Sequence, residues 1–468
     1  MAYSSFLASK KDVCKKLVNE LLKRYEYVSL LGTHSTGKGV GVSSRVTSIS
    51  DGMGSQCGFV VKIFNGSSYS EYSFSEIDDE SLETLISDIV NKVTLSKTLL
   101  DHRVAVSKMK DEPLVKDFIR PLEGKEYSLE EVVEKLTSFK DKMQSLSDKV
   151  IQAMARYSKT EVSNLFISRN RELTQNYSWI NVSLGAVVRE GQKVQMAHDV
   201  AAYNSEEISF AKAEAKLEGC VKLAEELLSA ESIVPGEYEI ITEPSITGLI
   251  AHEAFGHGVE MDMFVKNRAK AKDYVGEYVA SELVDMHDGA SSILSAASYF
   301  FDDDGVLAHD TLIIKNGVLQ TGISDALSAL QLGTEPTGNG RRESYKRKAY
   351  SRMTNTWFAP GSSDVEEMIK SVKHGYLLAE TDNGMEDPKN WNIQCVCAYG
   401  REIKDGKFTG KIVAPVCMTG YVPDLLKSIS MVSKEFEVIG SGYCGKGYKE
   451  WVPVADGGPY LKAKCKLG

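Results

Sequence analysis

Hydrophobic positions in the first part of the chain change from helical to strand-like spacing. Val13, Leu17 and Leu21 fall four residues apart, which is typical of one face of an amphipathic helix that packs on a core. Short β-branched runs with turn residues between them follow, and they indicate strands. These runs are YVSLLG, VGVSSRVTSI, GFVVKIF and YSEYSF. A second helix is predicted over residues 79–100.

Residues 128–157 have the pattern of a long helix. Ser128 and Glu131 have capping-box spacing at its start. Residues 164–190 then alternate between apolar and polar positions, like two strands of a hairpin. A helix over residues 206–228 is predicted to close this half.

A boundary between two halves is predicted near Pro235, where Pro-Gly punctuates a new strand. Pro244 suits the first turn of the helix that continues through SITGLIAHEAFGHG. Beyond Met261 we expect short strands, loops and one further helix over residues 363–374. The sequence therefore predicts an α+β protein. Its N-terminal helix-and-sheet domain would span residues 1–234, and its β-rich C-terminal domain residues 235–468.

The composition, 42% hydrophobic and 26% charged, is that of an ordinary globular protein. A formal net charge of −10 disfavours a dedicated nucleic-acid binder, whose surface usually carries a basic stripe. No stretch approaches the ~18 uninterrupted apolar residues of a membrane span. The first residues also lack the pattern of a signal peptide. We therefore expect a cytoplasmic protein whose eight cysteines are reduced thiols.

The segment GTHSTGKG, residues 32–39, nearly matches a phosphate-binding loop. Its last position is Gly39 rather than serine or threonine, so the contact to Mg²⁺ is missing. The following residues are strand-like, whereas the motif requires a helix there. We interpret the glycines as a turn between two strands, and we expect no nucleotide site.

The segment IAHEAFGHGVE carries the strongest chemical signal, because it places His252, Glu253 and His257 together. Hydrolytic zinc sites combine imidazole ligands with a nearby base. On a regular helix, residues five apart diverge by ~140°, so the two rings would not reach one ion. A π-bulge absorbs one extra residue, and Gly256 weakens the helix at this point. We therefore predict a helix that bulges or unwinds near Gly256, with Glu253 as the general base.

A third ligand has to come from outside this motif. Glu260 and Asp262 would either bind the metal or orient a histidine. Cys444, in GSGYCGKGYKEW, is the other option, because the surrounding glycines permit close approach of the backbone. Cys395 and Cys397 alternate along an apparent strand, where we expect buried packing thiols rather than ligands.

Longer blocks of the sequence resemble the TldD branch of the TldD/PmbA family of metalloproteases. HEAFGHGVE is similar to the H-E-x-x-x-H signature of that family. The resemblance continues through VPGEYEIITEPSITGLIAHEAFGHG, DDDGVLAHDTLIIKNGVLQTGISD, PTGNGRRESYKRKAYSRMTNTWFAPG and YCGKGYKEWVPVADGGPYLKAK. These blocks span most of the chain from Pro235 onward. KGYKEWVPVADGGP departs from the glutamine-rich continuation usual in the family, so substrate preference near the cysteine would differ.

The resemblance implies one zinc ion per chain, held by His252, His257 and Cys444, with Glu253 as the catalytic acid and base. Cys444 lies 187 residues after His257, so only a folded C-terminal domain carrying the metal site would bring these ligands together. The implied activity is a zinc-dependent peptidase of TldD type. It would hydrolyse extended or unfolded peptides, in peptide maturation or in degradation of small proteins.

The resemblance also implies a partner. Family members work as homodimers or as heterodimers with a metal-free PmbA/TldE-like paralogue, which lacks the histidine signature. The expected substrate is a peptide or unfolded protein, bound as an added strand along an exposed sheet edge. We expect no nucleic-acid partner and no membrane partner.

Two questions stay open at this level. The alternative to an enzyme is a non-catalytic peptide-binding or partner-regulating protein whose metal is absent or structural. A structural zinc site is usually closed by four protein ligands. Arg341 and Arg342, in GNGRRESY, would either hold a substrate carboxylate or lie in a solvated surface turn.

Overall fold

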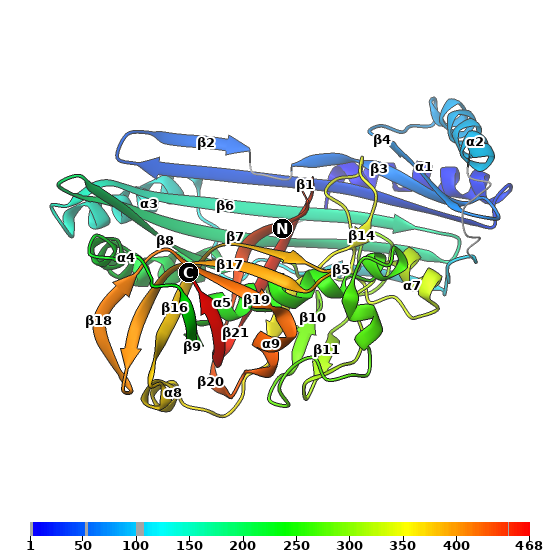
Figure 1. Ribbon diagram of the computed structural model, residues 1–468. Coiled ribbons are helices and arrows are strands. Elements are labelled where there is room, and N and C mark those ends of the chain that lie inside the picture. The colour runs from blue at the N-terminus through cyan, green and yellow to red at the C-terminus, as the bar shows by residue number, and fades with distance from the viewer. Residues whose placement is uncertain (1–2, 52–54, 100–106, 448) are drawn as a thin grey trace.

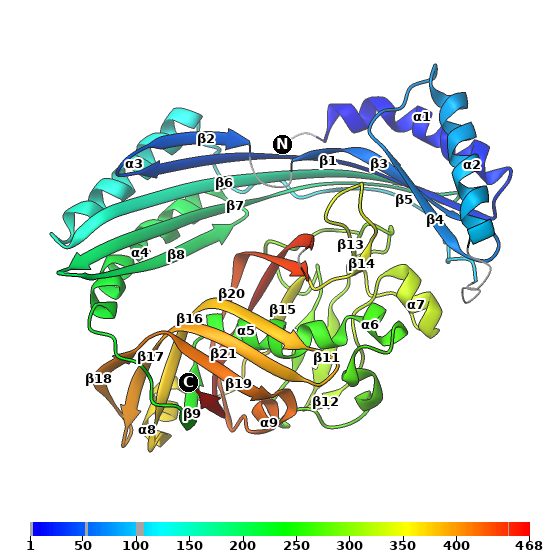
Figure 2. The same ribbon diagram turned by 45° about the horizontal axis from the view of Figure 1, so that its top comes forward.

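Two β-sheets organise the chain in the computed structural model, which describes residues 3–51, 55–99, 107–447 and 449–468 (Figure 1). The first sheet is long and curved, and it arches over a β-rich body formed by the rest of the chain (Figure 2). This arrangement confirms the α+β class predicted from the sequence. The predicted boundary near residue 235 falls between the two sheets and stays a prediction as a domain boundary.

The first sheet has eight strands in the order β4-β3-β1-β6-β7-β5, with β2 paired to β1 and β8 paired to β7. Neighbouring strands are antiparallel except β5, which is parallel to β7. The strands are β1 Tyr27–Ser43, β2 Thr47–Asp51, β3 Gln56–Phe64, β4 Tyr69–Phe74, β5 Leu114–Ile119, β6 Val150–Ile167, β7 Arg171–Glu190 and β8 Lys193–Tyr203.

Four helices cover the two ends of this sheet. They are α1 Ser5–Leu22, α2 Leu82–Leu99, α3 Leu129–Ser145 and α4 Glu206–Leu227. The first and second pack with β1 and β3, while α3 and α4 pack with β6 and β7. The predicted first and fourth helices are confirmed, as is the capping box at Ser128. The end predicted for the second helix, residue 100, lies outside the described residues.

Two predictions in this half are wrong. The helix predicted over residues 128–157 ends at Ser145, because the chain from Val150 onward pairs with β7. The glycines of residues 32–39 do not form a turn, because they lie inside the continuous strand β1. They serve close packing instead: a Cβ on Gly32 would lie 3.0 Å from Leu7 and from Phe59. The strand β2 follows rather than a helix, so the phosphate-binding motif lacks its structural context.

The second sheet has eleven strands in the main order β12-β11-β10-β15-β21-β19-β17-β16-β9, with β18 and β20 paired to β17 and β21. The strands are β9 Gly236–Thr242, β10 Met286–Asp288, β11 Thr311–Lys315, β12 Val318–Leu319, β15 Asn355–Phe358, β16 His374–Asp387, β17 Asn392–Lys404, β18 Lys407–Val413, β19 Val416–Tyr421, β20 Met431–Lys446 and β21 Lys449–Leu467. A separate pair is formed by β13 Gly340–Arg341 and β14 Tyr350–Ser351. The expectation of short strands is wrong for β16, β17, β20 and β21, which have 14, 13, 16 and 19 residues.

Short helices connect the strands of this half. They are α5 Pro244–Leu249, the π-helix η1 Ile250–Gly256, the 3₁₀-helices η2 His257–Val259 and η3 Lys270–Tyr274, α6 Met261–Val265, α7 Ala326–Leu332, α8 Val365–Ser371 and α9 Val422–Lys427. The prediction of a helix near residues 363–374 is confirmed by α8. The helices α6, α7 and α9 were not predicted, because so few residues give no recognisable periodicity. Within the described parts of the chain, no helix is long and apolar enough to cross a membrane.

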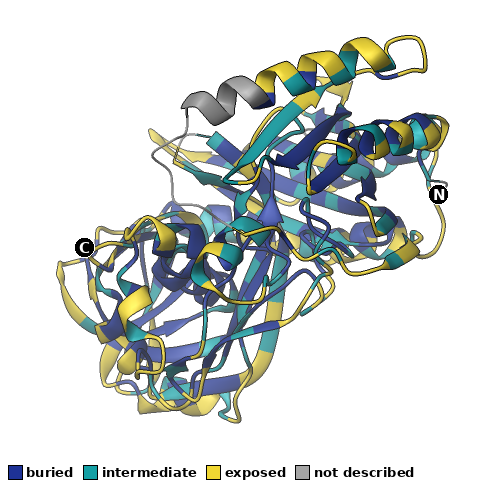
Figure 3. Cartoon of the chain, turned by 90° about the vertical axis from the view of Figure 1, so that its right-hand side faces the viewer, coloured by how far each residue is buried: buried dark blue, intermediate teal, exposed yellow. Residues whose placement is uncertain are grey.

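The two halves are joined by a buried cluster of charges. Arg342 of the second half donates two hydrogen bonds of 2.8 Å to the carboxylate of Glu71 on β4. Lys62 on β3 pairs with Asp304, also from the second half. Figure 3 shows exposed residues on the outer helices and loops, with buried residues along the strands. The halves therefore meet through specific ion pairs as well as apolar packing.

Candidate metal centre

The helix that carries both histidines changes its winding twice. It begins as the α-helix α5 with Pro244 in its first turn, continues as the π-helix η1, and tightens into η2. The backbone N–H of His257 donates to the carbonyl of His252, five residues earlier. This bond brings residues five apart onto one side of the helix. The bulge predicted from the sequence is confirmed.

Packing around Gly256 explains why the wide turn sits here. A Cβ on this residue would lie 2.1 Å from the sulfur of Met353 and 3.0 Å from the carbonyl oxygen of Ala251. Phe255 is fully buried and stacks on Trp391 at 5.9 Å between ring centroids. The helix is thus held on both sides by the core of the second half.

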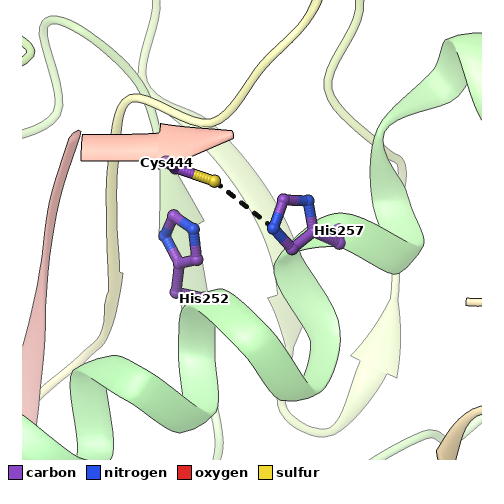
Figure 4. Close-up of side chains that lie close together, drawn as sticks. All are labelled: His252, His257 and Cys444. Carbon is purple, nitrogen blue, oxygen red and sulfur yellow. Dashed lines mark hydrogen bonds between the residues drawn. The ribbon is translucent and has the colours of Figure 1, made fainter. Parts of the chain in front are cut away.

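His252, His257 and Cys444 converge at one point, as Figure 4 shows. One potential ligand atom from each residue lies within 4.8 Å of the other two. The Nε2 atom of His257 is 3.3 Å from the Sγ atom of Cys444. The two imidazole rings are nearly perpendicular, with centroids 5.2 Å apart. Strand β20 supplies the cysteine, so the fold closes the 187-residue gap to the histidines.

Glu253 lies beside this group without belonging to it. Its two carboxylate oxygens are 3.9 Å from Nε2 of His252 and 3.8 Å from Nε2 of His257. Burial raises the pKa of Glu253, and the two neighbouring histidines oppose that rise. The carboxylate is therefore close enough to reach a small molecule held by the three donors.

Glu260 and Asp262, the other candidate ligands, lie outside the group of three. An oxygen of Glu260 is 3.3 Å from Nδ1 of His257, and the same carboxylate pairs with Lys446 and Arg352. Although burial would raise the pKa of Glu260, these positive groups hold it well below its usual range. Asp262 pairs with Lys446 at 2.6 Å. Glu260 thus orients the His257 ring, and Asp262 holds the lysine next to it.

Arg352 is the important residue that the sequence interpretation missed. Its side chain is fully buried, and its Nη2 atom donates to the Sγ atom of Cys444 at 3.0 Å. Its Nε atom donates to Glu260 at 3.0 Å, and Nη1 donates to the carbonyl of Glu450. One guanidinium therefore connects the cysteine to the carboxylate that orients His257. No periodicity or spacing in the sequence relates Arg352 to the histidine motif.

Two more acidic residues complete the surroundings. Glu386 on β16 accepts a hydrogen bond of 2.9 Å from the backbone N–H of Gly258. Asp456 on β21 has a carboxylate oxygen 3.9 Å from Nδ1 of His252. Neither residue has a neighbour in the sequence that indicates this position.

The three central groups shift each other's protonation. Burial raises the pKa of the Cys444 thiol, but His252 and His257 outweigh it and lower the pKa to about 4. Burial lowers the pKa of His252, but Cys444 outweighs it and raises the pKa to about 9. Cys444 is therefore held as the thiolate, which is the form that binds metals.

The donor set fits a zinc ion. Two imidazole nitrogens and one thiolate are ligands that zinc prefers. The Nδ1 atom of His252 is buried and has no hydrogen-bond partner among the described residues. A zinc ion held by these three donors alone would have room for a further, non-protein ligand, as in catalytic rather than structural zinc sites.

Other candidates from the sequence lie elsewhere. Cys395 and Cys397 are fully buried on β17, which confirms that they are packing thiols. Arg341 and Arg342 are only 8% exposed, so the interpretation as a solvated surface turn is wrong. Arg342 pairs with Glu71 in the ion cluster between the halves, whereas Arg341 does not belong to that cluster.

Comparisons with known proteins find metalloproteases that are similar to this chain. The profile of the PmbA/TldA metallopeptidase C-terminal domain matches residues 235–464. A metalloprotease of Methanothermobacter thermautotrophicus is 30% identical over 320 residues, which cover 68% of this chain and 69% of the relative. A zinc metalloprotease TldD homolog of Saccharolobus solfataricus is 27% identical over 400 residues, 83% of this chain and 86% of the relative.

A solved structure shares the fold. The crystal structure of TldE from Thermococcus kodakarensis superposes with a TM-score of 0.76 at 21% identity, covering 97% of this chain and 100% of that one. Fold, site and sequence relatives lead to one conclusion: the chain belongs to the TldD/PmbA family of metalloproteases.

Proposed function

We propose that the protein is a zinc-dependent peptidase of the catalytic, TldD-like branch, acting on extended or unfolded peptides. The observation that carries this proposal is the convergence of His252, His257 and Cys444 within 4.8 Å. These three residues would hold the metal, and Glu253 would serve as the base. The room for a further, non-protein ligand favours an enzyme over a structural zinc site.

The reaction divides between the metal and the protein. When bound, zinc supplies a Lewis acid that polarises the scissile carbonyl and lowers the pKa of the attacking water. Glu253 would take the proton from this water and deliver it to the leaving amine. Glu260 and Arg352 would keep His257 and Cys444 in the orientation that binding requires.

Strand β16 offers an edge that suits an extended peptide. Its pairing with β9 ends at Leu378, whereas its pairing with β17 continues to Asp387. Gly384 on this stretch lies against Glu253, since a Cβ there would be 2.5 Å from the Cγ atom of the glutamate. A peptide added along residues 380–387 would run past the proposed base and be bound mainly through its backbone.

The assembly is part of the proposal. We propose that the chain pairs either with a second copy or with a metal-free TldE-like paralogue. The likeness to a solved TldE structure supports a shared fold for two such partners. Light scattering of the purified protein, alone and mixed with that paralogue, distinguishes the two assemblies by mass.

Zinc content and peptidase activity of three proteins test the central proposal. Wild type is expected to contain about one zinc per chain and to hydrolyse an unfolded polypeptide. Cys444→Ala should lose the metal because it removes one of the three donors. Glu253→Gln should keep the metal and lose activity by about 10²–10⁴-fold, the usual contribution of a general base.

The opposite results are equally informative. If the wild type takes up no zinc even after loading, the enzyme proposal fails. The alternative, a peptide-binding or partner-regulating protein, would then stand. If Glu253→Gln loses zinc together with activity, Glu253 is a ligand rather than the base.

A further inference from the structure

A cavity of about 170 Å³ lies between the first sheet and the second half. Tyr177 and Trp179 on β7 line it from the sheet, and Tyr299, Arg341 and Tyr443 line it from the other side. An apolar cavity of about 150 Å³ is large enough to hold benzene. This cavity therefore has room for one amino-acid side chain or for the last residue of a peptide.

Arg341 is the unusual member of this wall, because its buried charge has no carboxylate within ion-pair distance among the described residues. Its guanidinium lies 5.6 Å from the centre of the Tyr299 ring. Arg341 is 8% exposed, and its Nη1 atom donates to the carbonyl of Met353 at 2.6 Å. The guanidinium has five N–H donors, and a buried arginine is almost always paired.

Nearby arginines show the contrast. Arg342 pairs with Glu71 at 2.8 Å, Arg347 with Glu343 at 3.8 Å, and Arg352 with Glu260 at 3.0 Å. Each of these three positive charges has its own carboxylate within the folded chain. Arg341 alone of the four faces the cavity without one.

The acidic residues of the cavity are occupied by other donors. Asp302 accepts hydrogen bonds from the backbone N–H groups of Gly340 and Val306. Asp303 accepts from the backbone of Arg342 at 2.7 Å. Asp303 also lies close enough to Arg341 for that charge to oppose the rise that burial causes in its pKa. Both carboxylates already accept hydrogen bonds from backbone groups, so the guanidinium of Arg341 remains suited to a negatively charged occupant of the cavity.

Two phenol groups, those of Tyr177 and Tyr443, also line the cavity. Burial raises the pKa of Tyr177 to about 12, and the charge of Arg341 opposes part of the rise. The phenol of Tyr177 therefore stays protonated at neutral pH and has an O–H to donate.

We propose that Arg341 binds a carboxylate of the peptide substrate in this cavity, either the free C-terminus or an acidic side chain. This assignment rests on the proposed peptidase function. A planar guanidinium matches a carboxylate through two parallel hydrogen bonds. Binding energy from such a remote group positions the reacting bond without contact to it.

The position of the cavity sets the reach of the substrate. Tyr443 and Cys444 are consecutive on β20, where their pairing with β21 is regular, so their side chains face opposite sides of the sheet. The cavity and the candidate metal centre therefore lie on opposite sides of this strand pair, so the bound carboxylate and the scissile bond belong to different residues of the substrate.

Binding of three matched octapeptides tests the inference. The first has a free C-terminal carboxylate, the second is the same peptide with an amidated terminus, and the third is amidated but carries glutamate as its last residue. Calorimetry with zinc-loaded Glu253→Gln protein measures affinity without turnover. The free acid is expected to bind about tenfold more tightly than the amide. The third peptide should match the first if an acidic side chain serves equally.

Variants assign the preference to Arg341. Arg341→Gln in the same background should remove the tenfold difference, and Arg341→Lys should reduce it because lysine lacks the planar fork. Arg347→Gln, an exposed arginine in the same loop, should keep it in full. Zinc content of each variant checks that the metal centre is intact. If Arg341→Gln does not fold, Arg341→Lys serves as the test: a reduced preference for the free acid supports the carboxylate site, and an unchanged preference contradicts it.

Equal binding of all three peptides would overturn the carboxylate site, as would a preference that survives in Arg341→Gln. A failure of the peptidase proposal is recognised separately. In that case the wild type hydrolyses none of the peptides, while the preference for a carboxylate persists.

Discussion

Arg352 controls the immediate surroundings of Cys444 more closely than any other side chain described above. Its hydrogen bond to sulfur, 3.0 Å long, satisfies a buried thiolate that would otherwise depend on the histidines alone. The same guanidinium holds Glu260, which orients His257. Because one side chain joins these two groups, its loss affects both ends of the metal centre.

Arg352→Lys tests this role. Lysine keeps a positive charge near Glu260 but lacks the fork that also reaches the sulfur. Zinc retention against a competing chelator is expected to fall about 10–100-fold, the usual effect of changing a residue that orients ligands. Arg347→Lys, whose side chain is 48% exposed, is the matched control. Equal retention in wild type and Arg352→Lys would show that the bond to sulfur is unimportant for the metal.

At this scale the sequence pointed to the residues of the candidate centre, but not to the residues that contact them. His252, Glu253 and His257 were found from their spacing, because chemistry and helix geometry act over a few residues. Cys444 was one option among several until the family resemblance selected it. Arg352 and Glu386 were not found, because hydrogen bonds between distant segments leave no local pattern. Arg341 was noticed, yet only the fold shows that it is buried.

Among the elements, the π-helix η1 is the one on which the centre depends. A π-helix has about one more residue per turn than an α-helix, so two histidines five residues apart lie on the same side of it. On an α-helix, a spacing of four would be needed. Gly256 permits this winding beside Met353, which occupies the space that a side chain would need. The wide turn is thus fixed by packing from outside the helix.

Gly256→Ala is expected to destabilise the protein. The added methyl would overlap Met353, and overpacking of this kind costs typically about 1–3 kcal/mol. Thermal unfolding should show a lower midpoint, with weaker zinc retention because the turn is displaced. Shortening the neighbour in Gly256→Ala/Met353→Ala should recover part of the zinc retention. An unchanged midpoint in the single variant would mean that the helix moves aside at no cost.

Strand lengths show where element prediction failed and why. The pattern of residues 150–157 suits a helix as well as a strand, and only pairing with β7 decides between them. In the second half, glycines that resembled loop residues lie within long strands such as β20 and β21. By contrast, α1 and α4 were predicted well, because long amphipathic helices carry their own signal.

At the scale of the whole molecule, the pair of Glu71 and Arg342 links the arching sheet to the body. Burial raises the pKa of Glu71, but Arg342 and Lys62 outweigh it and lower the pKa from 4.5 to about 2. A carboxylate whose pKa is lowered by folding stabilises the folded state above its unfolded pKa. That stabilisation is lost as the pH falls from about 4.5 toward 2.

Glu71→Gln should therefore destabilise the protein at pH 7 by about 1–3 kcal/mol, since it removes the carboxylate that accepts two hydrogen bonds from Arg342 and leaves only Asp304, 4.0 Å away, as its ion-pair partner. The difference from wild type should shrink as the pH falls below 4.5, because the wild-type carboxylate is then protonated in the unfolded chain. Denaturant unfolding across this pH range measures the difference in the free energy of unfolding between the variant and wild type. Glu335→Gln is the control, because its pair with Lys110 also joins the halves but is exposed. A constant difference at every pH would contradict the ion-pair explanation.

The late position of Cys444 in the chain also matters for synthesis. A nascent chain that has been made as far as residue 440 already contains His252, Glu253 and His257, but it lacks the thiolate and all of β21. That strand pairs with β9, β15, β19 and β20, so the sheet that holds the site cannot close before β21 has left the ribosome. Incomplete translation products therefore carry the histidine motif without a working centre.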